Sequence, residues 1–145
     1  MLTRLGSTFR LAVCVCALAG AATARAADQQ TRIQHVVDDL KTQLSIAQPV
    51  NVAIVETNPK LFSVVPVEHT GATFLLSVEE DFANGLSEDE LRAAVAHELG
   101  HVWIFTHFPY LQTEELANDI ASRVVSRASL APLYDKVWKK VGSAD

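Results

Sequence analysis

The sequence predicts an α+β fold in which a small antiparallel sheet of three strands packs against about four helices. Three short apolar runs rich in β-branched residues lie in the middle of the chain, and turn residues separate them. Apolar residues at helical spacing come before these runs and again after them. Strands and helices that occur in separate blocks favour helices packed on one small sheet.

The first half of the chain contains one helix signal and three strand signals. The helix is expected over residues 29–46, where apolar residues recur every three to four positions with charged residues between them. Pro49 ends it because proline lacks a backbone N–H. The strands are expected at residues 50–56, 61–67 and 72–78.

A proline and a polar turn determine the predicted arrangement of the strands. Pro66 has no N–H to donate to a neighbouring strand, so the second strand is expected at an edge of the sheet. Residues 68–71 read as a turn. A turn of this length between two strands predicts that the second and third strands pair as an antiparallel hairpin.

Helix signals fill the rest of the chain. Residues 87–90 form a capping box, with serine at the cap and glutamate three positions later, so a helix is expected over about 88–106. Pro109 prevents a long continuation of that helix. The next helix is expected over about 112–128, and apolar residues define one face of it.

The last helix is expected to begin near Pro132, because proline suits the first turn of a helix. Leu133, Val137 and Val141 then lie on one face. Both tryptophans of the chain are interpreted as core anchors, and Trp138 belongs to this helix.

Residues 1–26 have the pattern of a secretory signal peptide. Arginines precede an apolar run of 14 residues, and the small residues Ala24 and Ala26 offer a cleavage site followed by polar residues. The run is shorter than the ~20 apolar residues that a spanning helix needs, which favours cleavage over a retained membrane anchor. We therefore expect an exported protein, periplasmic or secreted, with a single domain over residues 27–145.

Removal of this segment changes the charge and the thiol content of the chain. The segment contains three arginines and none of the 17 acidic residues, so the mature chain has nine basic residues and a net charge of −8. This charge argues against nucleic acid and anionic membrane surfaces as partners. Both cysteines, Cys14 and Cys16, also lie in the segment. The mature chain therefore has no disulfide, no thiolate metal ligand and no cysteine nucleophile.

The helix that follows the capping box carries the motif His-Glu-Leu-Gly-His over residues 97–101. His97 and His101 are one turn apart on one helix face and can bind the same zinc ion. Glu98 lies beside them, placed to take a proton from a zinc-bound water and to pass it to a leaving amine. By composition alone the motif arises by chance roughly once or twice in a hundred chains.

A catalytic zinc usually has three protein ligands, and three residues are candidates for the third. His107 has the spacing of a longer histidine motif, but Ile104 replaces the glycine that would let the helix stop and turn back. Glu114 lies near the apolar face of the following helix, whereas Glu115 lies nearly opposite that face. A carboxylate at the edge of a buried face needs a partner, so Glu114 is the predicted ligand.

One further residue could support the site from outside the ligand set. Asn118 follows Glu114 by one helical turn and could hold a ligand histidine by a hydrogen bond, although a plain surface amide fits its position equally well.

The stretch from Leu86 to His101 resembles the gluzincin metalloproteases of the HtpX and CAAX-protease type. In those families the third ligand lies in Glu-x-x-Ala-Asp, which Glu114 to Asn118 matches with asparagine in place of aspartate; the asparagine is also similar to the ImmA/IrrE-type metallopeptidases. The resemblance covers about residues 50–125. It implies a zincin-like fold, a zinc endopeptidase activity and an edge strand, residues 61–67, that binds a peptide substrate by strand addition.

Two functions remain open at this stage. The leading hypothesis is a zinc metallopeptidase in which His97, His101 and Glu114 bind Zn²⁺ and Glu98 is the general base and acid. Its partners are peptide or protein substrates, with neither nucleic acid nor stable membrane insertion expected. A regulatory or docking protein could be a further partner. The alternative is an exported zinc-binding module that docks on a partner protein and hydrolyses nothing.

Overall fold

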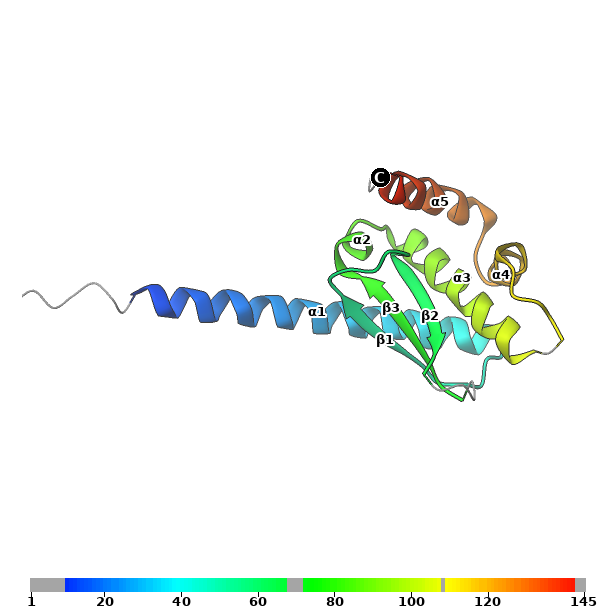
Figure 1. The fold of residues 1–145 in the computed structure, drawn as a ribbon, viewed down its shortest axis with the longest axis horizontal. Coiled ribbons are helices and arrows are strands. Elements are labelled where there is room, and N and C mark those ends of the chain that lie inside the picture. The colour runs from blue at the N-terminus through cyan, green and yellow to red at the C-terminus, as the bar shows by residue number, and fades with distance from the viewer. Residues whose placement is uncertain (1–9, 68–71, 108, 143–145) are drawn as a thin grey trace, which may run out of the picture.

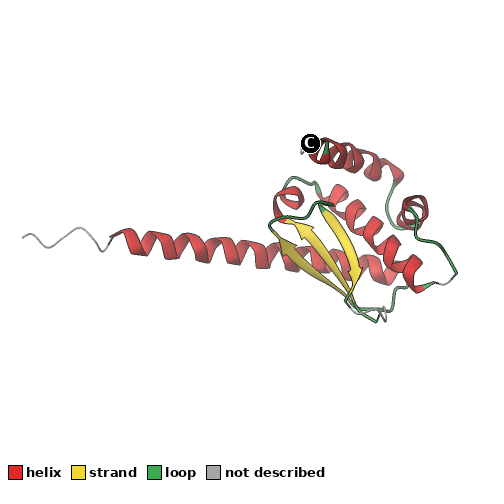
Figure 2. Ribbon diagram, in the orientation of Figure 1, coloured by secondary structure: helices red, strands yellow, loops and turns green. Residues whose placement is uncertain are grey.

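The structure of the protein is a computed structural model. It describes residues 10–67, 72–107 and 109–142, with side chains from residue 24 onward, so the predicted turn at 68–71 lies outside the described residues. The α+β prediction is confirmed (Figures 1 and 2). The elements are α1 (Arg10–Gln43), β1 (Val50–Val55), β2 (Phe62–Pro66), β3 (Phe74–Glu79), α2 (Glu80–Asn84), α3 (Glu88–Thr106), α4 (Glu114–Ala121) and α5 (Arg127–Val141).

The three strands form a mixed sheet in the order β1-β3-β2. β2 is an edge strand and pairs with β3 in antiparallel register, as predicted. The expectation of a wholly antiparallel sheet is wrong, because β1 pairs with β3 in parallel. The connection from β1 crosses the end of β3, where the Asn58 amide donates to the Ser77 carbonyl at 3.0 Å. β2 therefore lies at the far edge, and the hairpin brings β3 back between the other two strands.

Helix α1 passes behind the sheet in the view of Figure 1 and contacts β1. Helix α3 contacts β2, and the two helices contact each other. The apolar face predicted for α1 is buried and belongs to the hydrophobic core between this helix, the sheet and α3. Its residues are Ile33, Val36, Val37, Leu40 and Leu44. The first half of α1 projects away from the rest of the molecule (Figure 1). Within the described parts of the chain, none of the helices combines the length and apolar character that crossing a membrane requires.

The two edges of the sheet have different surroundings. At the β1 edge, Gln34 of α1 donates to the Val50 carbonyl at 3.0 Å and accepts from the Val52 N–H at 3.0 Å. Gln30 donates to the Val52 carbonyl at 2.8 Å. Side chains of α1 thus satisfy backbone groups that an edge strand would otherwise present to another chain. The β2 edge faces α3 instead.

The capping-box prediction for α3 is confirmed: the Ser87 hydroxyl accepts from the Glu90 N–H, and the Glu90 carboxylate accepts from the Ser87 N–H. The following helix, α4, ends after Ala121 rather than near residue 128. The last helix, α5, begins at Arg127 rather than near Pro132, so Pro132 lies inside it. Trp138 is 73% exposed, which contradicts its interpretation as a core anchor.

Candidate metal centre

Helix α3 places His97 and His101 on the side that faces α4. Their Nε2 atoms lie 3.2 Å apart, and their rings meet edge to face with centroids at 4.9 Å. Both side chains are largely shielded from solvent, at 13% and 21% exposure. The motif therefore brings two imidazole nitrogens to one point, as its i, i+4 spacing predicts.

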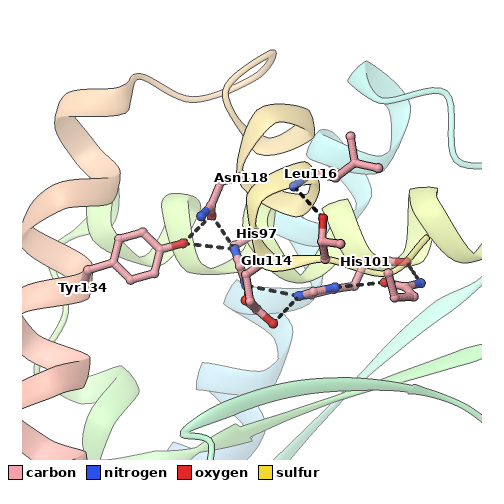
Figure 3. A network of polar contacts seen from close by, with 8 residues as sticks. His97, His101, Glu114, Leu116, Asn118 and Tyr134 are labelled. Atoms are coloured by element: carbon pink, nitrogen blue, oxygen red, sulfur yellow. Dashed lines mark hydrogen bonds and ion pairs between the residues drawn. The ribbon is translucent and has the colours of Figure 1, made fainter. Parts of the chain in front are cut away.

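Helix α4 brings Glu114 to the same point (Figure 3). Its N-cap is Thr113, whose hydroxyl accepts from the Leu116 N–H, so Glu114 is the first residue of the helix. One carboxylate oxygen lies 3.1 Å from His97 Nε2 and the other 3.5 Å from His101 Nε2. One ligand atom from each of the three residues lies within 4.8 Å of the others.

The carboxylate of Glu114 is more exposed than the sequence argument assumed. Its side chain is 77% exposed, so burial does not force it to find a partner. Its position at the start of α4, next to the two histidines, places it in the cluster. Glu115 is also exposed and, among the described residues, belongs to no cluster of three metal-ligating groups.

Small residues allow α4 to approach α3 closely enough for this contact. A Cβ atom on Gly100 would lie 2.4 Å from the Ala117 carbonyl oxygen and 2.9 Å from the Ala117 Cα atom. Ala117 and Ala121 are both fully buried. Ala117 and Gly100 therefore form the two sides of the close contact between α4 and α3.

A carboxamide oxygen lies within hydrogen-bond distance of the Nδ1 atom of each imidazole, the ring nitrogen that points away from the cluster. His97 Nδ1 lies 2.7 Å from Asn118 Oδ1, so of the two alternatives for Asn118 the structure favours support of a histidine over a plain surface amide. His101 Nδ1 lies 3.1 Å from Gln112 Oε1, a contact that sequence reasoning missed. Tyr134 of α5 also reaches this network: its hydroxyl donates to Asn118 Oδ1 and lies 3.2 Å from His97 Nδ1 (Figure 3).

The donor set fits a divalent cation such as zinc. Two imidazole nitrogens and one carboxylate converge, while the other ring nitrogens are occupied by hydrogen-bond partners. Lone pairs that face one another at such distances repel unless a cation or a proton lies between them. Zinc accepts this combination of nitrogen and oxygen ligands, and three protein ligands leave a fourth position open.

Glu98 lies in the wall of a cleft beside the cluster. The cleft has a volume of about 460 Å³ and is bounded by β2, α3, the start of α4 and α5. The residue is only 9% exposed. Burial raises the pKa of its carboxyl group, opposed by the nearby His97 and His101 and by a hydrogen bond from the Val64 backbone. A buried carboxyl group with a raised pKa suits proton transfer near neutral pH.

The outer edge of β2 borders the same cleft. The Glu79 N–H donates to the Leu61 carbonyl, and the Val67 N–H donates to the Thr73 carbonyl. In an antiparallel pair such bonds recur at every second residue, so the backbone groups of Val64 and the carbonyl of Pro66 point away from β3. The predicted edge strand therefore presents backbone hydrogen-bonding groups beside the histidine cluster.

His107, the histidine candidate for the third ligand, packs against an aromatic ring instead of joining the cluster. His107 caps the end of α3 and stacks on Trp103 with ring centroids 3.9 Å apart, so it is no member of the cluster. Tyr110 and Arg123 also contact the Trp103 ring. Tyr134 is different, because it lines the cleft.

Comparisons with known proteins agree with this geometry at the level of the fold. The structure is similar to the crystal structure of the metallopeptidase zymogen abylysin from Pyrococcus abyssi, with a TM-score of 0.54 and 17% sequence identity. The match covers 76% of this chain and 95% of that protein. No protein-family model matches the sequence, and no curated protein matches it either. The chain thus has a metallopeptidase fold with a His-His-Glu cluster that could hold a metal ion.

Proposed function

We propose that the protein is an exported zinc metallopeptidase of the gluzincin type. The convergence of His97, His101 and Glu114 within 4.8 Å carries this proposal. Glu98 lines the cleft beside these residues, and the fold is that of a metallopeptidase. The exported location rests on the sequence pattern of residues 1–26, with cleavage after about Ala26.

Metal binding, positioning of a ligand and proton transfer would each fall to different residues of the site. When bound, zinc would polarise the scissile carbonyl group and lower the pKa of a water molecule. His97, His101 and Glu114 would hold the ion, and Asn118 would keep the His97 ring in place. Glu98 would accept a proton from the attacking water and deliver it to the leaving amine, a task helped by its raised pKa.

The substrate would be a peptide in extended conformation. The Val64 and Pro66 carbonyls point away from β3 and can accept hydrogen bonds from an added strand, which is a common mode of peptide recognition. The Val64 backbone already bonds Glu98, so a peptide strand added here would lie next to the general base. At the β1 edge, by contrast, Gln30 and Gln34 already bond the outward-pointing backbone groups of Val50 and Val52.

Zinc content and peptide hydrolysis test the proposal together. We expect one zinc per chain by elemental analysis of residues 27–145 and a loss of zinc in Glu114→Ala. Glu115→Ala is the matched control, because Glu115 is a neighbouring exposed carboxylate outside the cluster. Absence of zinc from the parent, even after zinc addition and removal of the excess, would overturn the metal site.

The role of Glu98 needs a separate variant. Glu98→Gln should retain zinc and lose peptide hydrolysis by at least the 10²-fold that removal of a general base typically costs. Because the similar structure is that of a zymogen, activity should be measured before and after limited proteolysis. Unchanged hydrolysis in zinc-loaded Glu98→Gln contradicts the mechanism. Full zinc loading without hydrolysis of any peptide would favour the zinc-binding module that docks on a partner.

A further inference from the structure

We infer that Gln112 is a positioning residue that fixes the tautomer and the ring orientation of His101. Gln112 belongs to the connection between α3 and α4 and lies two residues before Glu114. Its side-chain amide makes two contacts with one residue of α3. Nε2 donates to the His101 carbonyl at 3.0 Å, and Oε1 lies 3.1 Å from His101 Nδ1.

The first contact determines which way the amide points. A backbone carbonyl can only accept a hydrogen bond, so the atom that faces it must be the amide nitrogen. The amide oxygen must then face the imidazole. If the amide were reversed, an oxygen would face the carbonyl oxygen, and the contact would become repulsive.

The second contact then determines where the imidazole carries its hydrogen. The amide oxygen can only accept, so His101 Nδ1 must donate. In a neutral imidazole the other nitrogen, Nε2, is then free of hydrogen and presents its lone pair. That atom lies 3.2 Å from His97 Nε2 and 3.5 Å from Glu114 Oε1, inside the cluster. Gln112 therefore prepares His101 to bind a metal before any metal arrives.

The position of Gln112 in the chain adds a second effect. Its contact with the His101 carbonyl ties the connection to α3 immediately before the Thr113 cap of α4. The Gln112 side chain thus links the imidazole ring of His101 to the start of α4, which carries Glu114. The consequence for zinc rests on the proposed function, whereas the tautomer is inferred from the two contacts that Gln112 makes with His101.

Nitrogen NMR of the metal-free mature protein tests the tautomer directly. Spectra of ¹⁵N-labelled histidine, recorded about two pH units above the ordinary histidine pKa of ~6.5, distinguish the two neutral forms. We expect His101 to carry its hydrogen on Nδ1 in the parent. Gln112→Met, which keeps the length but neither contact, should lose this preference. Gln112→Glu keeps an acceptor for Nδ1 and should preserve it.

Zinc affinity, measured by competition with a chelator, supplies the second readout. Gln112→Met should weaken binding by about 10- to 100-fold, the range for loss of a partner behind a ligand. Gln112→Glu should retain more affinity than Gln112→Met. Gln43→Met is the matched control: Gln43 is an exposed glutamine of α1 whose side chain contacts Asp39, and this variant should match the parent in both readouts.

Three results would overturn the inference. They are hydrogen on Nε2 of His101 in the metal-free parent, an unchanged tautomer in Gln112→Met, and equal loss of affinity in the Gln112→Met and Gln112→Glu variants. The last result would mean that Gln112 only fastens the connection. If the parent shows the Nδ1 tautomer, lost in Gln112→Met, but binds no zinc, then the proposed function fails while the positioning of His101 stands.

Discussion

At the scale of single residues, the site combines a motif visible in the sequence with contacts that the sequence conceals. His97, Glu98 and His101 could be predicted because helical spacing fixes their relative positions. Glu114 was predicted through its helical position, although its carboxylate proves to be exposed rather than at the edge of a buried face. Gln112 could not be predicted, because it lies in an irregular connection whose path no periodicity defines.

Glu98 should make the stability of the metal-free protein depend on pH. Its folded pKa is raised above the unfolded value of ~4.3, chiefly by burial. As pH rises, the unfolded chain loses this proton first, so the native state binds more protons between the two pKa values and stability falls there. Above both values the penalty is constant, at about 1.4 kcal/mol for each unit by which the pKa is raised.

Glu98→Gln removes the ionisation and should abolish this penalty. With zinc chelated, urea unfolding should give equal stabilities for parent and variant below about pH 4, and a more stable variant above the folded pKa. Glu115→Gln, at an exposed position of α4, is the control and should show no such growing difference. A stability difference between Glu98→Gln and the parent that stays constant across the range would contradict the effect of burial on Glu98.

At the scale of helices and strands, the errors of prediction have a common origin. The apolar residues from Leu116 to Ala128 fit one continuous helix, yet Ser122 bonds back to the Asn118 carbonyl and the chain turns. Val124 and Val125 still pack against the core from the turn, so their spacing could not distinguish the two cases. The start of α5 had a local signal, because the Ser126 hydroxyl caps the Ser129 N–H. Pro132, which suits the first turn of a helix, instead favoured a start several residues too late.

The parallel pairing of β1 with β3 could not be predicted from the local sequence, for a different reason. A hairpin turn predicts that its two strands pair, and β2 and β3 do so. Which strand β1 joins depends on the path of its connection across the end of β3, and that path is fixed by tertiary contacts such as that of Asn58. Those contacts exist only once the sheet has formed.

The close contact between α3 and α4 makes Gly100 sensitive to substitution. In Gly100→Ala the new methyl group would meet the Ala117 backbone at 2.4 Å, so α4 must move. Alanine gains about 1 kcal/mol in helix propensity, but overpacking against backbone costs about 1–3 kcal/mol. We expect a net loss of stability and weaker zinc binding, because Glu114 moves with α4.

Urea unfolding and chelator competition measure the two effects of Gly100→Ala. Gly85→Ala is the control, since a Cβ atom there would meet its nearest neighbour at an ordinary 3.4 Å. That variant should change neither zinc affinity nor stability by a comparable amount. If Gly100→Ala were as stable as the parent and bound zinc equally well, close packing of α4 would not be required for the site.

At the scale of the whole molecule, the site lies between one edge of the sheet, strand β2, and the helix pair α3 and α4. Side chains of α1 occupy the β1 edge, while the β2 edge borders the cleft together with α3 and α5. The three metal-ligating residues come from α3 and α4, two helices that meet through Gly100 and Ala117. A metal ion at this point would therefore join two helices that unfolding separates.

Zinc should consequently stabilise the folded protein as a whole. A ligand that binds only the folded state adds about 2.7 kcal/mol at a free concentration 100 times its dissociation constant. We expect the urea midpoint of the parent to rise with buffered free zinc, and that of Glu115→Ala to rise equally. Glu114→Ala, which keeps two of the three ligands, should gain much less. Since the Glu114 side chain is 77% exposed, its removal should cost little stability in the absence of zinc. Equal midpoints for the parent with and without zinc would contradict a metal that joins α3 to α4, whereas an equal gain in Glu114→Ala would leave the histidines as the only ligands.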